Sequence, residues 1–212
     1  MKPLKLAVLA SGRGSNFEAI LKAIESGKLN AQVQVAISNN STAGALEIAR
    51  NHGIPAIHLS HKQFSTPEEF DEQLLKILSE HQVELVVLAG YMKMLSPRVV
   101  QQFKNRILNI HPALLPSFGG KGLYGIHVHQ AVLDYGCKVT GVTVHLVDET
   151  YDTGPPVLQR CVPVLDDDTP ETLAARVLEV EHQVYAEALQ LFAEGRVEVK
   201  GRRVRIKDKT GV

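Results

Sequence analysis

The feature that most constrains the fold is a repeated alternation of short apolar runs with amphipathic helical patterns. The runs Leu4–Ala10, Val33–Ser38 and Val83–Ala89 contain few polar residues, as strands of a parallel sheet do when helices cover both of its faces. Apolar residues recur at helical spacing between these runs, and the helical stretch Thr42–His52 ends at Gly53. The sequence therefore predicts a doubly wound α/β fold, a mostly parallel twisted sheet with helices on both faces, at least through residue 110.

Two signals mark expected helix starts. Thr66 is a capping residue, Pro67 stands at the first helical position, and Glu69 follows three residues after the cap, which is the capping-box pattern. The pair Thr169-Pro170 repeats this signal and begins a long helix that we expect to reach about Glu194.

The pattern changes after Ile107–Ile110. A loop rich in proline and glycine, His111–Gly125, is followed by a short helix. Two further strand-like runs, Lys138–Val147 and Val157–Leu165, are expected to pair antiparallel, and Arg196–Ile206 is typical of a hairpin. We therefore expect antiparallel strands in the C-terminal half of the chain.

Composition and charge exclude several classes of protein. The 23 basic residues equal the 23 acidic residues in number, so no net field attracts nucleic acid or an anionic membrane. Two cysteines in 212 residues form no disulfide framework and fit a reducing cytosol. The first apolar run is too short for a signal peptide or a membrane span. We expect a cytoplasmic protein that binds neither nucleic acid nor membrane.

A glycine-rich loop stands between the first expected strand and helix, with the sequence Ser11-Gly12-Arg13-Gly14-Ser15-Asn16. Backbone N–H groups in such a loop and the positive end of the helix accept a phosphate. The loop is neither a G-x-G-x-x-G fingerprint nor a lysine-bearing P-loop, so neither a dinucleotide nor a triphosphate is specifically indicated. A tight turn without a ligand is the alternative.

Asn109 and His111 flank Ile110 at the end of an expected strand, so their side chains project to the same side. An amide there can stabilise a developing oxyanion, and an imidazole can move a proton near neutral pH. The pair therefore suits acyl transfer. A packed or surface histidine at a strand end is the alternative.

The loop that ends at Gly154 carries three carboxylates, on Asp148, Glu149 and Asp152. A carboxylate that reached His111 would orient the ring and raise its pKa. Spacing alone does not choose among the three, and a solvated turn is the alternative.

His127 and His129 are spaced like a pair of metal ligands, but no accompanying pattern supplies a third ligand. We expect no metal and place both histidines on a helix surface. Neither cysteine lies beside a histidine in the sequence, so a catalytic thiol is not favoured. A solvated hairpin and a frayed tail are expected for the basic C-terminal residues Arg196, Lys200, Arg202, Arg203, Arg205, Lys207 and Lys209.

The chain resembles the folate-dependent formyltransferases in three blocks and in the glycine-rich loop, over essentially residues 4 to 195. The blocks are N-I-H-P-A-L-L-P at Asn109–Pro116, G-V-T-V-H at Gly141–His145 and Y-D-T-G at Tyr151–Gly154. The resemblance implies a Rossmann-like formyltransferase fold. It also implies direct transfer of the formyl group of 10-formyltetrahydrofolate, the co-substrate, to the amino group of glycinamide ribonucleotide in purine biosynthesis, without a metal.

The resemblance also implies roles for individual residues. Asn109 and protonated His111 would stabilise the tetrahedral oxyanion formed by direct attack of the amine, and Asp152 would support His111 and relay a proton. The phosphate of the ribonucleotide would be held by Gly14, Ser15 and Asn16 in a loop that Gly12 shapes, and its glycinamide end would meet Glu181. The pterin would bind along Met92, Lys93, Met94 and Leu95, with Asn109 beside it.

The sequence departs from some members of that family at two places. Where they carry an arginine that contacts the folate, this chain has Ser65-Thr66-Pro67, so we expect no folate contact there. The loop Ser117–Gly125 is longer by a few residues, and Lys121 within it has no assigned role.

We expect one formyltransferase domain over residues 1–212. Residues 1–110 would be the phosphate-binding half, 111–195 the catalytic and folate-binding half, and 196–212 a C-terminal hairpin and tail. An enzyme that formylates transfer RNA or hydrolyses the donor would be expected to carry an extra domain, so we expect the ribonucleotide as the acceptor. The protein would be a monomer or a homodimer. Formyl hydrolysis, another acceptor and a non-catalytic nucleotide-binding module are the alternatives.

Overall fold

The computed structural model describes residues 2–209 and divides into two compact units, Met1–Leu108 and Asn109–Val212. Its main sheet has seven strands in the order β3-β2-β1-β4-β5-β6-β7. The first unit contains β1 (Leu4–Leu9), α1 (Ser15–Glu25), β2 (Ala31–Ser38), α2 (Gly44–Asn51), β3 (Ala56–His58), the 3₁₀ turn η1 (His61–Gln63), α3 (Pro67–Glu80), β4 (Leu85–Leu88) and α4 (Pro97–Gln102). The strand β5 (Ile107–His111) runs across the boundary. The second unit contains α5 (Ile126–Asp134), β6 (Val139–Leu146), β7 (Pro156–Pro163), α6 (Pro170–Ala193), β8 (Val197–Lys200) and β9 (Arg203–Ile206).

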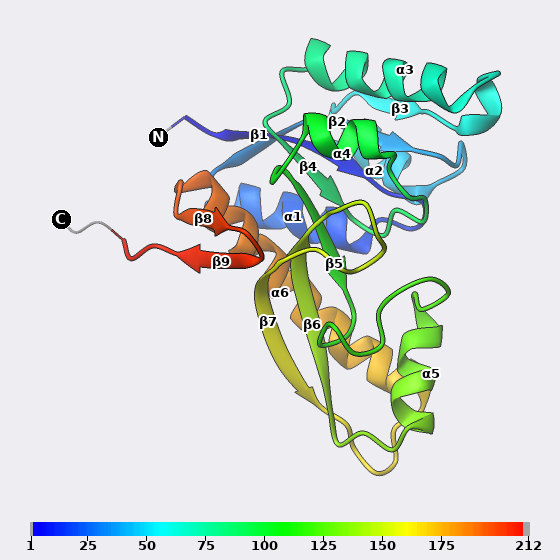
Figure 1. Cartoon of the computed structure of the whole chain (residues 1–212), viewed down its shortest axis with the longest axis vertical. Coiled ribbons are helices and arrows are strands. Elements are labelled where there is room, and N and C mark those ends of the chain that lie inside the picture. The colour runs from blue at the N-terminus through cyan, green and yellow to red at the C-terminus, as the bar shows by residue number, and fades with distance from the viewer. Residues whose placement is uncertain (1, 210–212) are drawn as a thin grey trace. The chain divides into compact units, whose positions relative to one another are not determined.

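The first unit is the doubly wound fold that the apolar runs predicted. β1 pairs in parallel with β2 and β4, and β2 pairs in parallel with β3. The chain steps outward from β1 to β3 and then returns to β4, so right-handed crossovers place α3 on the face opposite α1. Figure 1 shows these two helices on opposite sides of the strands. The order therefore reverses between β1 and β4, which is the switch point where ligands bind in such sheets.

The start of α3 confirms the predicted cap but only half of the capping box. The side chain of Thr66 accepts a hydrogen bond from the N–H of Glu69 at 3.2 Å, and Pro67 is the first helical residue. The carboxylate of Glu69, however, accepts from the N–H of Ser65 at 2.9 Å. The reciprocal bond therefore goes to the residue before the cap.

The second unit contains the antiparallel strands that were expected. β6 pairs antiparallel with β7, and the register shifts between Val144 and His145. The long helix α6 packs on both strands and against α5, and Figure 1 shows it running behind β6 and β7. The hairpin β8–β9 pairs antiparallel as predicted. Part of the predicted frayed tail, residues 210–212, lies outside the described residues.

Candidate active site

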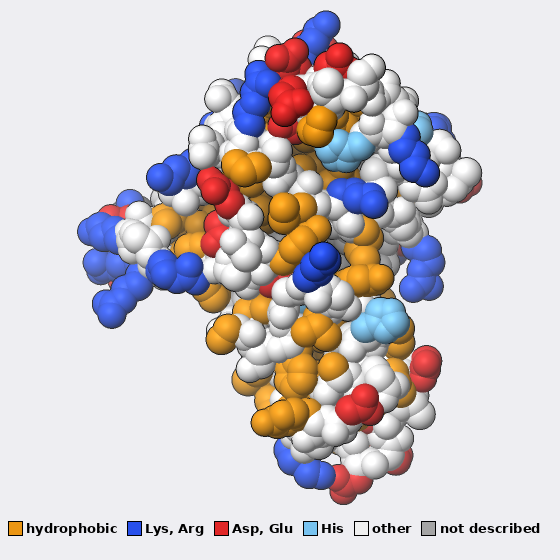
Figure 2. Space-filling model, turned by 45° about the vertical axis from the view of Figure 1, so that its right-hand side comes forward, with side chains coloured by type: hydrophobic (Ala, Val, Ile, Leu, Met, Phe, Trp, Pro, Cys, Tyr) orange, Lys and Arg blue, Asp and Glu red, His pale blue; other side chains and the backbone are white. Residues whose placement is uncertain are grey.

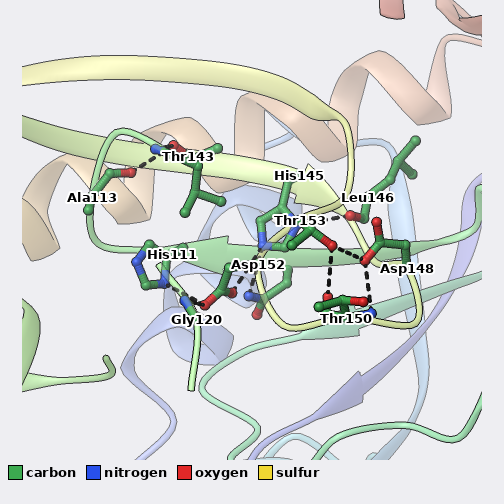
Figure 3. A network of polar contacts seen from close by, with 12 residues as sticks. His111, Ala113, Gly120, Thr143, His145, Leu146, Asp148, Thr150, Asp152 and Thr153 are labelled. Carbon is green, nitrogen blue, oxygen red and sulfur yellow. Dashed lines mark hydrogen bonds and ion pairs between the residues drawn. The ribbon is translucent and has the colours of Figure 1, made fainter. Parts of the chain in front are cut away.

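Four side chains from β5, β6 and the acidic loop meet in the second unit, and Figure 3 shows three of them, His111, His145 and Asp152, close together. Asn109 and His111 come from the end of β5, and His145 comes from β6. The ring atom Nδ1 of His111 lies 3.6 Å from Oδ2 of Asp152, and Nε2 of His145 lies 3.6 Å from Oδ1 of the same carboxylate. The amide Nδ2 of Asn109 lies 3.1 Å from Nε2 of His145. The structure therefore brings the three residues named by the resemblance into one cluster.

His145 is the member of this cluster to which the sequence analysis gave no role. It lies where the register of β6 shifts, and its ring is buried. Its Nδ1 lies 2.8 Å from the carbonyl oxygen of Leu146, which can only accept, so Nδ1 carries the proton. In the neutral ring Nε2 is bare and accepts a hydrogen bond from the amide of Asn109. His145 therefore fixes which way the amide of Asn109 points.

The proton on His111 is assigned in the same way. Its Nε2 lies 2.8 Å from the carbonyl oxygen of Phe118 and therefore donates to it. In the neutral ring Nδ1 is bare, and it faces the carboxylate of Asp152. A proton taken up by His111 would therefore sit between the ring and a negative charge.

Burial decides the pKa of His111. Burial lowers the pKa below its ordinary value, although the carboxylate of Asp152 and the carbonyl of Phe118 raise it. The expectation of a raised pKa is therefore wrong, because the sequence revealed the carboxylate partner and not the cost of desolvation. His111, 4% exposed, is neutral near pH 7 unless a bound charge offsets this cost.

Asp152 is the ionised member of the cluster. Burial raises its pKa, but the facing Nε2 of His145, which can donate to the carboxylate when it carries a proton, and a hydrogen bond from the N–H of Gly120 lower it more, so the pKa lies below its ordinary value. The bond from Gly120 to Oδ2 measures 2.9 Å. Asp148 is engaged differently, since its Oδ1 accepts from the N–H of Thr150 and from the hydroxyl of Thr153. Of these two aspartates, Asp152 is the one that reaches the histidines.

Segment 117–125, which had no assigned role, contacts both His111 and Asp152 through its backbone. The carbonyl of Phe118 accepts from His111, and the N–H of Gly120 donates to Asp152. A Cβ at Gly119 would lie 2.5 Å from a methyl of Leu115 and 3.1 Å from the Cβ of Asp152. Close approach of this segment to Asp152 therefore requires glycine at that position.

The glycine-rich loop lies at the switch point of the first unit. The N–H of Ser11 donates to the carbonyl of Gly90 at 3.0 Å, and the N–H of Met92 donates to the hydroxyl of Ser11 at 2.8 Å. Gly14 is the N-cap residue of α1 with φ of 89°, and a Cβ there would lie 2.9 Å from the Cα of Ala45. The loop and the stretch after β4 are therefore joined by direct hydrogen bonds.

The other sequence-predicted binding residues differ in exposure. Met92 and Met94 are 46% and 48% exposed, Lys93 is exposed, and Leu95 is buried. Leu95 can therefore offer a ligand only its backbone. Ser15 and Asn16 form the first turn of α1. Gly12 has open space around its Cα, and Glu181 is buried in α6 of the second unit.

The histidines of α5 correct one expectation. His127 lies on the surface, whereas His129 is 4% exposed. Burial lowers the pKa of His129, and the nearby His111 lowers it further. A surface position was expected because a helix of nine residues carries too little periodicity to distinguish its faces.

Two features are absent from residues 2–209. Within that range no group of three or more His, Cys, Asp or Glu residues could hold a metal ion. Within the same range no helix has both the length and the apolar character that crossing a membrane requires.

Comparisons with known proteins agree on one family. Residues 4–189 match the family model described as formyl transferase. A protein named phosphoribosylglycinamide formyltransferase, chloroplastic, from Vigna unguiculata is 47% identical over 91% of this chain, which spans 62% of that protein. The phosphoribosylglycinamide formyltransferase of Haemophilus influenzae is 40% identical, with 92% of this chain and 90% of that protein covered. The crystal structure of glycinamide ribonucleotide transformylase 1 from Symbiobacterium toebii superposes with a TM-score of 0.91 at 43% identity, covering 98% of this chain and 95% of that one.

Proposed function

This chain belongs to the formyl transferase family, and from that membership we propose that it transfers the formyl group of 10-formyltetrahydrofolate to the amino group of glycinamide ribonucleotide in purine biosynthesis. The choice of acceptor is supported by two relatives named phosphoribosylglycinamide formyltransferase and by a solved structure named glycinamide ribonucleotide transformylase. The observation that supports this chemistry is that Asn109 and His111 both belong to one cluster around an ionised Asp152.

Asn109 is proposed to stabilise the oxyanion. Its amide nitrogen has two N–H groups, and one of them donates to His145. The amine attacks the formyl carbon, and the carbonyl oxygen becomes negative in the tetrahedral intermediate. The second N–H of Asn109 would donate to this oxygen, and an oriented donor of this kind costs little reorganisation during the reaction.

His111 is proposed to move the proton. The attacking nitrogen must lose a proton, and the folate nitrogen must gain one before it leaves. Neutral His111 would accept the first proton on Nδ1, where the carboxylate of Asp152 stabilises the imidazolium. The same proton would then pass to the leaving nitrogen, so the enzyme returns to its starting state without a covalent intermediate.

Substrate binding is proposed to use the segments at the switch point of the first unit. Gly12, Gly14, Ser15 and Asn16 would hold the phosphate through backbone groups at the start of α1. The exposed Met92 and Met94, with Lys93 and the backbone of Leu95, would contact the folate. Asn109 would also contact the folate, and Glu181 would meet the glycinamide end.

The broader assignments are proposals of the same kind. Residues 1–212 would act as one formyltransferase domain with the three parts described from the sequence. Its substrates would be small molecules, with neither nucleic acid nor membrane as a partner, and it would be a monomer or a homodimer. Two free cysteines, Cys137 and Cys161, are consistent with a cytoplasmic location, although a plant relative is named as chloroplastic.

One assay tests the reaction. Loss of 10-formyltetrahydrofolate is followed by absorbance with and without glycinamide ribonucleotide, and formylated product is identified by mass spectrometry. We expect donor loss only when the ribonucleotide is present. Donor loss without it, with release of formate, would show hydrolysis instead. No loss in either case would show another acceptor or a nucleotide-binding module.

A further inference from the structure

The proposed reaction uses no residue of the basic hairpin β8–β9. Figure 2 shows blue side chains gathered over this hairpin, at the left of the view. In its register Val197 lies opposite Ile206 and Val199 opposite Val204, and these four side chains are half-buried. The charged residues therefore lie on the other face or at the turn.

The base of the hairpin is fixed to the end of α6. The guanidinium of Arg196 lies 2.9 Å from Glu194, the residue that caps this helix, and its Nε donates to the carbonyl of Lys207 at 2.7 Å. The ion pair with Arg196 helps to lower the pKa of Glu194 to about 2. Because α6 packs on β6 and β7, the hairpin is anchored to the strands that flank the acidic loop.

The turn of the hairpin reaches that loop. The Nη2 of Arg202 donates to the carbonyl of Thr153 at 2.6 Å, a contact between residues 49 positions apart. Thr153 directly follows Asp152, which has a φ of 56°, a left-handed conformation that costs an aspartate free energy. The next residue, Gly154, packs so closely that a Cβ would lie 1.8 Å from the carbonyl oxygen of Leu146. The backbone after Asp152 is therefore held on two sides.

We propose that Arg202 is a positioning residue for the reaction: by holding the carbonyl of Thr153, it keeps the carboxylate of Asp152 against His111 and His145. This inference rests on the proposed roles of His111 and Asp152. Arginine suits the task because its guanidinium is always charged and presents several donors in a fixed plane. The neighbouring Arg203 is also exposed, and it faces Lys200 across the hairpin.

Arg203 supplies the matched control, because it carries the same charge one residue away. We would compare Arg202→Gln with Arg203→Gln and with Arg202→Lys, and measure kcat, KM, the melting temperature and the pKa of His111 by NMR titration. Arg202→Gln should lower kcat about fivefold, with little change in KM or melting temperature, since a hydrogen bond of a charged donor is lost. Arg202→Lys should recover part of kcat, and Arg203→Gln should behave as wild type.

The direction of the pKa shift separates positioning from a simple charge effect. Loss of a nearby positive charge raises the pKa of a histidine, whereas withdrawal of Asp152 lowers that of His111, because this carboxylate raises it. We expect a fall in Arg202→Gln and no further fall when Asp152→Asn is already present. A rise, an unchanged pKa, an equal effect of Arg203→Gln or a full effect in the Asp152→Asn background would overturn the proposal. The titration needs no turnover, so it remains decisive if the formyl acceptor is another molecule.

Discussion

The glycine-rich loop of the first unit and the cluster around Asp152 in the second unit rely on different chemical groups. At the switch point of the first unit, the backbone N–H groups of Ser11 and Met92 donate to the carbonyl of Gly90 and the hydroxyl of Ser11, and Gly14 fits because it lacks a Cβ. In the second unit, side chains from separate segments meet around one carboxylate. A backbone site depends on conformation and tolerates most side chains, whereas a side-chain cluster depends on individual atoms. Substitutions should therefore affect the two regions in different ways.

The largest expected effect separates chemistry from binding. His111→Ala should lower kcat by about a thousandfold, because proton transfer by a placed residue contributes roughly 10²–10⁴. Titration calorimetry should show that glycinamide ribonucleotide still binds, since its phosphate is assigned to the backbone loop of the first unit. The exposed His127→Ala is the control and should keep full turnover. Loss of ribonucleotide binding in His111→Ala would mean that binding and proton transfer are not assigned to separate regions.

The backbone region should respond to a single methyl group. Gly14→Ala should destabilise the fold by about 2 kcal/mol or more, because a Cβ meets Ala45 and a left-handed φ costs an L-residue about 1–2 kcal/mol. Chemical denaturation measures this change. Gly12→Ala adds the same methyl group where no atom lies within 4 Å, and it should leave the stability nearly unchanged. Equal losses in the two variants would show that local space is not the reason for glycine at position 14.

The side-chain region should depend on the acceptor atom of His145. His145→Leu should lower kcat about tenfold or more, because the amide of Asn109 loses the hydrogen bond that orients it. His145→Gln should recover part of the rate, since its carbonyl oxygen can accept the same bond. The ratio of the two rates is the measurement. If leucine and glutamine were equally slow, the orientation of Asn109 would not be what His145 supplies.

The smallest expected effect is a loss of stability in acid. Burial lowers the pKa of His111 and His129, so the unfolded chain binds protons that the folded chain does not. The stability that the two neutral histidines contribute is complete above the ordinary histidine pKa of about 6.5. It is lost as the pH falls below that value, by at most about 1.4 kcal/mol per histidine and pH unit.

Thermal melts between pH 7.5 and 5.5 test this effect. His129→Leu should reduce the fall in melting temperature between pH 7.5 and 5.5, whereas substitution of the exposed His127 by leucine should not. A slope that is the same in all three proteins would assign the acid sensitivity to other groups.

The two regions also differed in how far the sequence could predict them. The parallel strands β1, β2 and β4 are mostly buried on both faces, so their apolar runs show directly in the sequence. The helix α4 was not predicted, because its six residues are too few to show a helical period. The antiparallel pairing of β6 with β7 was predicted from its strand-like runs.

The site in the second unit was less accessible to sequence reasoning. Spacing did not select Asp152 among three carboxylates, and only the family resemblance did so. The role of His145 depends on the register shift in β6 and on the carbonyl of Leu146, which no residue pattern encodes. The sign of the pKa shift of His111 depends on burial, which is a property of the packed molecule.

One oxygen atom of Asp152 has a wider consequence. Its Oδ2 lies 3.6 Å from His111 and also accepts the N–H of Gly120 at 2.9 Å. The reactive imidazole and the neighbouring glycine-rich segment thus face the same carboxylate oxygen, so a change in the charge of the carboxylate also changes the strength of the hydrogen bond from Gly120. Losses of activity from substitutions at Asp152 and at Gly120 should therefore not add.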